Sequence, residues 1–428
     1  MPSRVAPIRN SVSITFNRKS FAAERGEPVA ASLVAAGYVA LARSPKFHRP
    51  RGPWCMRGGC DGCLARVDGV PNVMTCAIPA RDQMVIESQN SLGTRTTDLL
   101  RATDWFFPQG VNHHELFAGV PGLRSAMQAF AERITGLGRI PSVVAQPKAA
   151  CRRTADVLVI GAGPSGMAAA LACAKRGRSV EVIDMSLQRG GGARAVVGRA
   201  SDEWSPLLSE FDDAVSKGGV KLRLQTVVAG IFHGELLVVG GEATEIVRPK
   251  TTVLACGAHD ALPAFENNDI PGIFSARAAG WLFSNGVSIG DSVVVACSPG
   301  EGLFGVAYAE ALKASGHESV RLVHGDVVSA SGSSHVKQVT VRKVGGEELT
   351  IKADALVVDA PRSPSYELSV QAGVDVGFEN GRFRVPAGSP SKGIWGVGEM
   401  VGTKLSRVDM QAEAARVAEA SLVDQSSE

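Results

Sequence analysis

Hydrophobic and polar residues alternate near the start of the chain, where residues 12–16 read Val-Ser-Ile-Thr-Phe. A period of two is typical of a half-buried strand, and after a turn at 17–18 the chain returns through 19–22, so we predict a hairpin. A short helix is predicted over residues 28–37, because proline opens this segment and glycine closes it. The Asp-Gly pair at 68–69 predicts a second hairpin.

A long uncharged run covers residues 157–174. Its length raises the question of a membrane span, but glycines and a proline at 161–166 interrupt it after a strand-like Val-Leu-Val-Ile. The rest is an alanine-rich helix, so a buried strand followed by a helix explains the run better. Further buried strands are predicted at 180–183, 252–255, 292–296 and 320–323, and helices at 305–315 and 410–420.

Composition limits the class of protein. The 428 residues allow about three domains, each with its own core. The net charge of +3 comes without a basic cluster interleaved with aromatic residues, so nothing indicates nucleic-acid binding. The first residues lack the apolar stretch of a secretory signal, and the eight cysteines do not suggest a disulfide framework. We therefore expect a cytoplasmic protein without a transmembrane segment.

Four cysteines stand in one informative pattern. Cys55, Cys60 and Cys63 form C-x4-C-x2-C, and Cys76 follows at a distance, which is the plant-type spacing for a 2Fe-2S cluster. The glycines between them allow the backbone to curl and to point amide N–H groups at sulfur. A zinc site is the alternative, although zinc ribbons usually present two separated C-x2-C-like pairs.

A second motif lies between the first buried strand and its helix. It reads G-x-G-x-x-G, and the next strand ends in an acid about 20 residues later, which together predict dinucleotide binding. The glycines would admit a pyrophosphate to the helix N-terminus, and the acid would accept hydrogen bonds from ribose hydroxyls. The candidate cofactor-binding residues here are Gly161, Gly163, Pro164, Ser165, Gly166 and Asp184. This motif leaves open whether the nucleotide is FAD or NAD.

Later motifs resemble the flavoproteins with two dinucleotide-binding domains, a family that includes glutathione reductase and ferredoxin reductases. Gly191 and Gly192 follow the acid, Gly257 follows a strand, and Gly398-Glu399 precede the closing helix. The resemblance implies FAD, with Glu399 reaching its flavin side, although Asp is commoner there. An ordinary turn is the alternative for each glycine cluster taken alone.

A second dinucleotide-binding domain is expected inside the first. Its loop, residues 297–302, reads Cys-Ser-Pro-Gly-Glu-Gly, so the first two glycines of the motif are replaced. The following strand is predicted to end at His324 instead of an acid. Side chains at the first two positions obstruct the tight turn and the pyrophosphate. NAD binding is therefore doubtful, and we expect a scaffold.

The predicted fold is α/β: an N-terminal beta-grasp 2Fe-2S ferredoxin-like domain fused to a glutathione-reductase-like flavoprotein. A helical stripe in the connector (Leu123, Met127, Phe130, Ile134) indicates core packing, His113 and His114 are read as surface residues, and residues 146–154 as a linker. The predicted domains are 1–97 (2Fe-2S), 98–153 (connector and linker), 154–270 (FAD, first part), 271–354 (degenerate NAD-like) and 355–428 (FAD, second part).

The whole arrangement, including the connector motif that starts at Trp105, resembles the alpha-type subunits of heteromeric sarcosine oxidase, opine oxidase and hydrogen cyanide synthase. The resemblance implies a second flavoprotein subunit that oxidises a secondary amine or amino acid, with room for small accessory subunits. This chain would help to carry the electrons away. It departs from the family in lacking the C-terminal aminomethyltransferase-like domain of sarcosine oxidase alpha, which puts folate coupling in doubt, and a second cysteine-rich cluster.

No cysteine pair, nucleophile with a base or positioned histidine identifies a catalytic residue. We therefore expect an electron-transfer subunit with FAD and a 2Fe-2S cluster, part of an amine or amino-acid dehydrogenase of the sarcosine, opine, proline or glycine type. One alternative is a self-sufficient NAD(P)H-dependent flavin reductase that uses the fused cluster. Another is a non-catalytic scaffold subunit.

Overall fold

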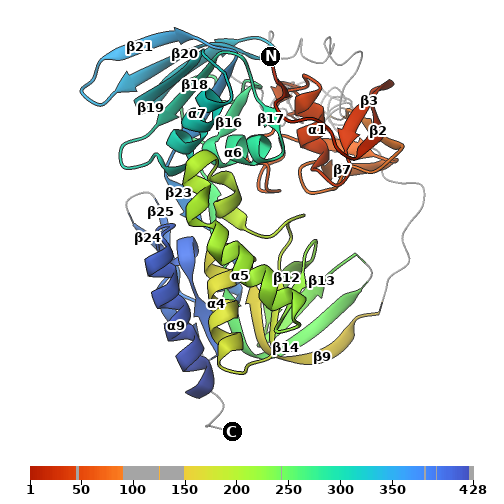
Figure 1. Cartoon of the computed structure of the whole chain (residues 1–428), viewed down its shortest axis with the longest axis vertical. Coiled ribbons are helices and arrows are strands. Elements are labelled where there is room, and N and C mark those ends of the chain that lie inside the picture. The colour runs from red at the N-terminus through yellow and green to blue at the C-terminus, as the bar shows by residue number, and fades with distance from the viewer. Residues whose placement is uncertain are drawn as a thin grey trace. The chain divides into compact units, whose positions relative to one another are not determined.

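The structure is a computed structural model that describes residues 1–44, 48–89, 125, 149–241, 243–379, 382–391 and 393–423. The chain forms two compact units (Figure 1). Unit 1 comprises residues 1–144, 263–300 and 312–359, and unit 2 comprises 145–262, 301–311 and 360–428. The predicted connector helix, its apolar stripe, the two adjacent histidines and the linker up to residue 148 lie outside the described residues.

The amino-terminal sheet of unit 1 confirms both predicted hairpins. Its strand order is β3-β2-β8-β6-β7. The strands are β2 (Ser11–Phe16), β3 (Lys19–Glu24), β6 (Leu64–Val67), β7 (Val70–Met74) and β8 (Met84–Glu87). The predicted helix is α1 (Val29–Ala35), which begins one residue after Pro28 because this proline is its N-cap. Ile14, Leu33 and Ile86 are fully buried and form the core between sheet and helix. Short strands β1 (Ser3–Arg4), β4 (Ala42–Arg43), β5 (Pro50–Arg51) and β17 (Val287–Ser288) complete this region.

The other sheet of unit 1 has the order β16-β22-β18-β19-β20-β21. Its first four strands are parallel, and the last two extend it in antiparallel fashion. The strands are β16 (Ile273–Ser275), β18 (Val293–Cys297), β19 (Val320–Gly332), β20 (Val336–Lys343), β21 (Glu348–Lys352) and β22 (Ala355–Asp359), with helices α6 (Ala276–Ser284) and α7 (Leu303–Ala314). The prediction that the strand ends at His324 is wrong, because residues 325–332 find a partner strand in β20.

Unit 2 contains the larger sheet, with the order β11-β10-β9-β14-β13-β12 and β27 beside β14. Strands β11, β10, β9, β14 and β27 are parallel. The strands are β9 (Cys151–Ile160), β10 (Val180–Ile183), β11 (Val220–Arg223), β12 (Val227–Phe232), β13 (Glu235–Val239), β14 (Thr244–Leu254) and β27 (Ile394–Gly396). The buried core of this sheet includes Leu158, Val238 and Val247.

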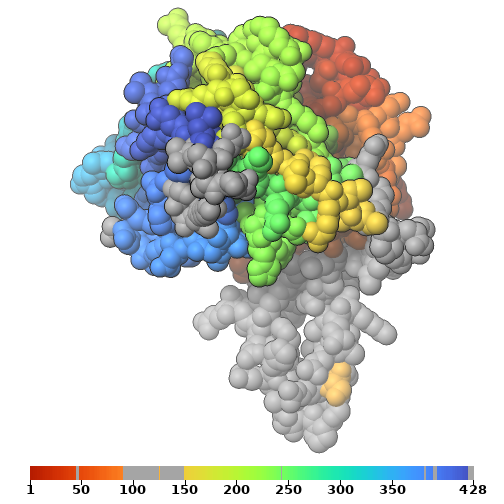
Figure 2. All heavy atoms as spheres, turned by 90° about the horizontal axis from the view of Figure 1, so that it is seen from below, coloured from red at the N-terminus to blue at the C-terminus, as the bar shows by residue number. Residues whose placement is uncertain are grey.

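Helices cover the parallel strands of unit 2. They are α4 (Pro164–Lys175), α5 (Ser205–Ser216), α8 (Glu367–Gln371) and α9 (Arg407–Val423). The carboxyl-terminal helix α9, blue in Figures 1 and 2, packs along the yellow α4. The remaining elements are β15 (Ala258–Asp260), β23 (Arg362–Pro364), β24 (Gly377–Glu379), β25 (Arg382–Arg384), β26 (Gly388–Ser391), and the 3-10 turns η2 (Gly191–Ala195), η3 (Gly198–Glu203) and η4 (Gly398–Val401). Within the described part of the chain, no helix is long and apolar enough to cross a membrane.

The predicted linker over 146–154 is wrong at its carboxyl end. Residues 151–154 belong to β9 and pair in parallel with β14. Arg153 forms ion pairs with Glu181 at 2.8 Å and Glu245 at 3.0 Å, and Arg223 pairs with the same two acids. Two basic residues that suggest a solvated linker therefore belong to a sheet, because acids on neighbouring strands balance the charge of Arg153.

An ion pair beside the first parallel strand of unit 2 provides a test of stability. Arg178, which is 6% exposed, donates to both carboxylate oxygens of Asp156 at 2.9 and 2.7 Å. These bonds lower the pKa of Asp156. Asp156→Asn should cost roughly 2–3 kcal/mol in free energy of unfolding at pH 7, because a buried guanidinium loses its counter-ion.

The pH dependence of this effect follows from the direction of the pKa shift. A carboxyl whose pKa is lower in the folded state stabilises the fold above its unfolded pKa, about 3.9, and loses that contribution as the pH falls through the folded pKa. The difference in urea unfolding between wild type and Asp156→Asn should therefore shrink below about pH 4. An unchanged difference in strong acid would show that this ion pair is not its cause.

Candidate functional site

The four cysteines of the plant-type pattern lie together as two pairs. The Sγ atoms of Cys55 and Cys60 are 3.4 Å apart, and the thiols of Cys63 and Cys76 hydrogen-bond to each other. A tetrahedral zinc ion would hold all four sulfurs about 3.8 Å from one another. Among the described residues, no three His, Cys, Asp or Glu side chains gather around a single ion position. Two thiol pairs fit the two irons of a 2Fe-2S cluster better than one zinc ion.

Backbone amides point at these sulfurs, as the glycines between the cysteines predicted. The amide of Gly58 donates to Cys76 Sγ at 3.2 Å, and that of Gly59 donates to Cys55 Sγ at 3.3 Å. The hydrogen bond from the Cys55 thiol lowers the pKa of Cys60 to about 6, and the bond with Cys76 lowers the pKa of Cys63. One sulfur of each pair is thus prepared to be a thiolate, the form that ligates metals.

The cluster loop is fixed against neighbouring backbone within unit 1. A Cβ on Gly62 would lie 1.9 Å from the carbonyl oxygen of Gly52, and one on Gly52 would lie 3.3 Å from Pro271 Cα. The carbonyl of Trp54 also accepts a hydrogen bond of 3.0 Å from the amide of Ser275, the N-cap of α6. The sequence motif does not reveal this anchoring, because it joins segments about 220 residues apart.

The glycine loop of unit 2 is built as the dinucleotide motif predicts. A Cβ on Gly161, whose φ is +112°, would lie 2.3 Å from the carbonyl oxygen of Ala255, and one on Gly166 would lie 1.9 Å from the Gly161 carbonyl oxygen. Both glycines therefore serve close packing of the loop. At Gly163, by contrast, the nearest neighbour of an added Cβ would be Gly191 Cα at 3.9 Å. This position leaves room for a pyrophosphate above the N-terminus of α4, which starts at Pro164.

Asp184 lies at the end of β10 and faces this loop. Its two carboxylate oxygens accept hydrogen bonds from the amides of Ala162 at 2.6 Å and Ser186 at 2.7 Å. These bonds fix the carboxylate beside the glycine loop and leave acceptor capacity on both oxygens. Its contact with a ribose remains a prediction.

The other predicted cofactor residues converge on the same loop, with one exception. A Cβ on Gly191 would lie 2.8 Å from Gly163 Cα, and one on Gly398 would lie 2.2 Å from Ser165 Oγ. Gly192 is next to Glu399, since its added Cβ would be 4.0 Å from Glu399 Oε2. Three motifs far apart in sequence thus form one cradle.

The exception is Gly257. An added Cβ there would meet no atom within 4 Å, and the carbonyl accepts a 3.0 Å hydrogen bond from the amide of Ser365. The described contacts therefore place Gly257 at the crossing between β14 and β15 and not within the cradle.

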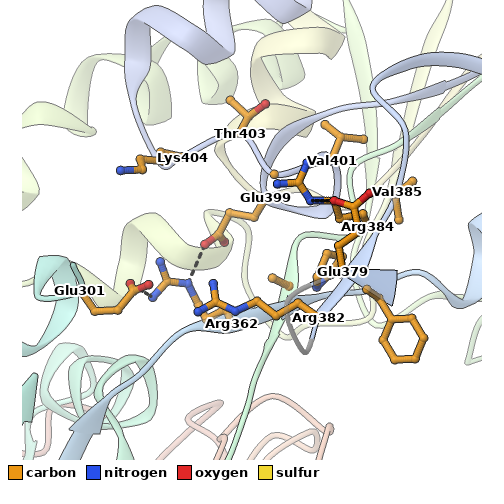
Figure 3. A pocket seen from close by; sticks show the side chains of 14 residues that line it. Glu301, Arg362, Glu379, Arg382, Arg384, Val385, Glu399, Val401, Thr403 and Lys404 are labelled. Carbon is orange, nitrogen blue, oxygen red and sulfur yellow. Dashed lines mark hydrogen bonds and ion pairs between the residues drawn. The ribbon is translucent and has the colours of Figure 1, made fainter. Parts of the chain in front are cut away.

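A charged triad that sequence reasoning missed lies next to Glu399. Arg362 Nε donates to Glu399 Oε1 at 2.8 Å, and Arg362 Nη1 lies 3.4 Å from Glu301 Oε2 (Figure 3). The guanidinium carbon is 5.0 Å from the ring centroid of Phe304. All three charged side chains are 20% exposed or less. Glu301 belongs to the loop that lost the second glycine motif, so this loop contributes a carboxylate to the FAD-type unit.

The degenerate second loop has an acid that the sequence reading also missed. Ser298 Oγ donates to Asp326 Oδ1 at 2.7 Å, two residues beyond His324. Asp326 was overlooked because the strand was expected to stop at His324. An acid therefore does lie beside this loop, although Cys297 and Pro299 still stand in the glycine positions.

Comparisons with known proteins agree with both sites. Residues 9–91 match the 2Fe-2S iron-sulfur cluster binding domain family, and residues 155–328 match the pyridine nucleotide-disulphide oxidoreductase family. The alpha subunit of sarcosine oxidase from Rhizobium meliloti (strain 1021) is 25% identical over 87% of this chain and 42% of that protein. An opine oxidase subunit from Agrobacterium tumefaciens (strain Ach5) is 30% identical over 34% of this chain and 32% of that protein. The chain thus spans less than half the length of these relatives.

Among solved structures, L-proline dehydrogenase from P. horikoshii has a similar fold. Its TM-score is 0.71 at 22% sequence identity, and the match covers 99% of this chain and 75% of that chain. At this identity the likeness concerns the fold alone.

The matched domains and the site geometry define an iron-sulfur flavoprotein, an oxidoreductase built for FAD and a 2Fe-2S cluster. Within that class, the chain is a relative of the alpha-type subunits of sarcosine oxidase, opine oxidase and hydrogen cyanide synthase, as its motifs predicted.

Proposed function

We propose that this chain is the electron-transfer subunit of a heteromeric amine or amino-acid dehydrogenase, of the sarcosine, opine, proline or glycine type. A partner flavoprotein subunit in the cytoplasm would oxidise the amine. FAD accepts electrons in pairs and the cluster passes them singly, so this chain would convert one kind of transfer into the other. The relatives named as oxidase subunits support the proposal.

We assign the cofactors to the residues whose geometry fits them. Cys55, Cys60, Cys63 and Cys76 would hold the cluster. The cradle around Gly163 would hold FAD, with Gly161 and Gly166 shaping the loop and Glu399 at its far side.

The observation that carries the proposal is the absence of substrate chemistry among the described residues beside the cradle. A cavity of about 490 Å³ adjoins Glu399, and the residues that line it include no cysteine and no histidine. Cys256, close to the crossing at Gly257, has its pKa raised to about 12 by burial, so its thiol stays protonated. These features do not suit a disulfide reductase, which needs a reactive cysteine pair. Substrate oxidation is therefore assigned to the partner.

The experiment is anaerobic reduction of the flavin in the isolated chain and in the complex with its native partner. Adding the amine substrate should bleach the flavin of this chain only when the partner is present. NADH or NADPH should reduce the isolated chain slowly or not at all, because Cys297 and Pro299 obstruct the second loop.

The two alternatives predict different results. Rapid bleaching of the isolated chain by NADH would replace this proposal with the self-sufficient reductase, a reading that Asp326 beside the second loop favours. A flavin that never changes its redox state while the partner turns over would instead support the scaffold.

A further inference from the structure

The cavity beside Glu399 lies wholly within unit 2 and is lined mainly by charged side chains. Four cations and three carboxylates face it: Arg362, Arg382, Arg384, Lys404, Glu301, Glu379 and Glu399 (Figure 3). They come from β23, β24, β25, η4, the residues that follow η4 and the loop before α7. None of the residues proposed to hold the pyrophosphate lines this cavity.

Ion pairs within the cavity account for all three carboxylates. Arg362 lies between Glu301 and Glu399, and Arg384 pairs with Glu379 at 3.2 Å. Arg382 and Lys404 have no ion-pair partner among the side chains that the structure describes. The cavity therefore carries a net charge of +1, with two cations available to an incoming anion.

The walls that carry these two cations are held in place. Phe383, next to Arg382, packs on Tyr366 with ring centroids 4.2 Å apart and on Phe378 at 5.1 Å. On the opposite wall, Glu413 accepts hydrogen bonds from the Gly398 amide at 2.8 Å and from the hydroxyl of Thr403. The Thr403 hydroxyl is thereby occupied, which leaves Arg382 and Lys404 as the available donors.

We propose that this cavity binds a small monocarboxylate through Arg382 and Lys404. The planar guanidinium of arginine matches a carboxylate with two parallel hydrogen bonds, and lysine adds a point charge. A single negative charge balances the cavity, whereas a phosphate dianion would exceed its net charge. This inference goes beyond the proposed function, because binding requires neither a partner subunit nor turnover.

The test is a titration of the purified FAD-loaded chain with acetate, followed by saturation-transfer NMR. Acetate should bind at one saturable site with a Kd on the order of 1–10 mM, and neutral acetamide should not compete. Arg382→Gln combined with Lys404→Gln should weaken acetate binding by about tenfold or more. The matched control is Arg384→Gln combined with Glu379→Gln, which removes one balanced pair from the same cavity and should change the Kd by less than about threefold.

Three outcomes would overturn the assignment. Absence of saturable acetate binding would exclude a carboxylate site, and inorganic phosphate binding more tightly than acetate would make this a phosphate site. Loss of FAD from the Arg382/Lys404 double variant would show that these cations hold the dinucleotide itself. Since no partner or amine is present, failure here would leave the proposed electron-transfer role intact, and failure of that role would leave this site intact.

Discussion

Replacing Gly163 with valine should remove FAD from the chain without unfolding it. The residue has φ −76° and ψ 179°, a backbone conformation that valine adopts readily. Its added Cβ would meet no protein atom closer than 3.9 Å, so the polypeptide has room for a side chain. The pyrophosphate of a dinucleotide needs that same space. Flavin content per chain should fall to a small fraction of the wild-type value, while iron content and the thermal transition of the cluster domain stay unchanged.

The contrasting variant is Gly166→Val in the same loop. Its side chain would collide with the carbonyl oxygen of Gly161, since even a Cβ would lie 1.9 Å away. Gly166→Val should therefore lower the stability of unit 2 as well as its flavin content, whereas Gly163→Val should affect flavin alone. Wild-type FAD occupancy in Gly163→Val would show that the nucleotide binds elsewhere.

Replacing Cys60 with serine should remove the iron and leave the FAD. Anaerobically purified wild type should contain about two irons and two sulfides per chain, because four thiolates ligate a 2Fe-2S cluster. Cys60 supplies the thiolate whose pKa is lowered to about 6, and a serine hydroxyl does not ionise near neutral pH. Iron, acid-labile sulfide and the visible absorption of the cluster should fall together, while extracted flavin stays at one per chain.

The control for this experiment is Cys151→Ser, which changes an exposed cysteine outside the pattern. Its iron and sulfide should equal those of the wild type. In complex with the partner, Cys60→Ser should still allow the amine to bleach the flavin but should slow transfer to one-electron acceptors. Stoichiometric zinc without iron in the wild type would contradict the cluster assignment.

Local patterns in the sequence predicted a large part of this molecule. The alternation at 12–16 and the Asp-Gly turn at 68–69 each gave a hairpin, since strand and turn signals lie within a few neighbouring residues. The cysteine spacing and the glycine loop around Gly163 were equally readable, because each motif is short and its chemistry requires those residue types at that spacing.

Contacts between distant segments were decided only by the tertiary structure. Residues 151–154 are a strand because β14 lies alongside them, and β19 extends past His324 because β20 pairs with it. Strand pairing depends on a partner that local periodicity does not contain, which explains why both predictions failed.

The charged groups beside the cradle follow the same physical rule. The sequence determined which cysteines, glycines and acids the chain possesses, and their spacing determined that it can hold a cluster and a dinucleotide. The fold determined that Cys55 pairs with Cys60, and that Arg362 sits between Glu301 and Glu399. Ion pairs and thiol pairs act over a few ångströms, so they exist only once the backbone has brought their members together.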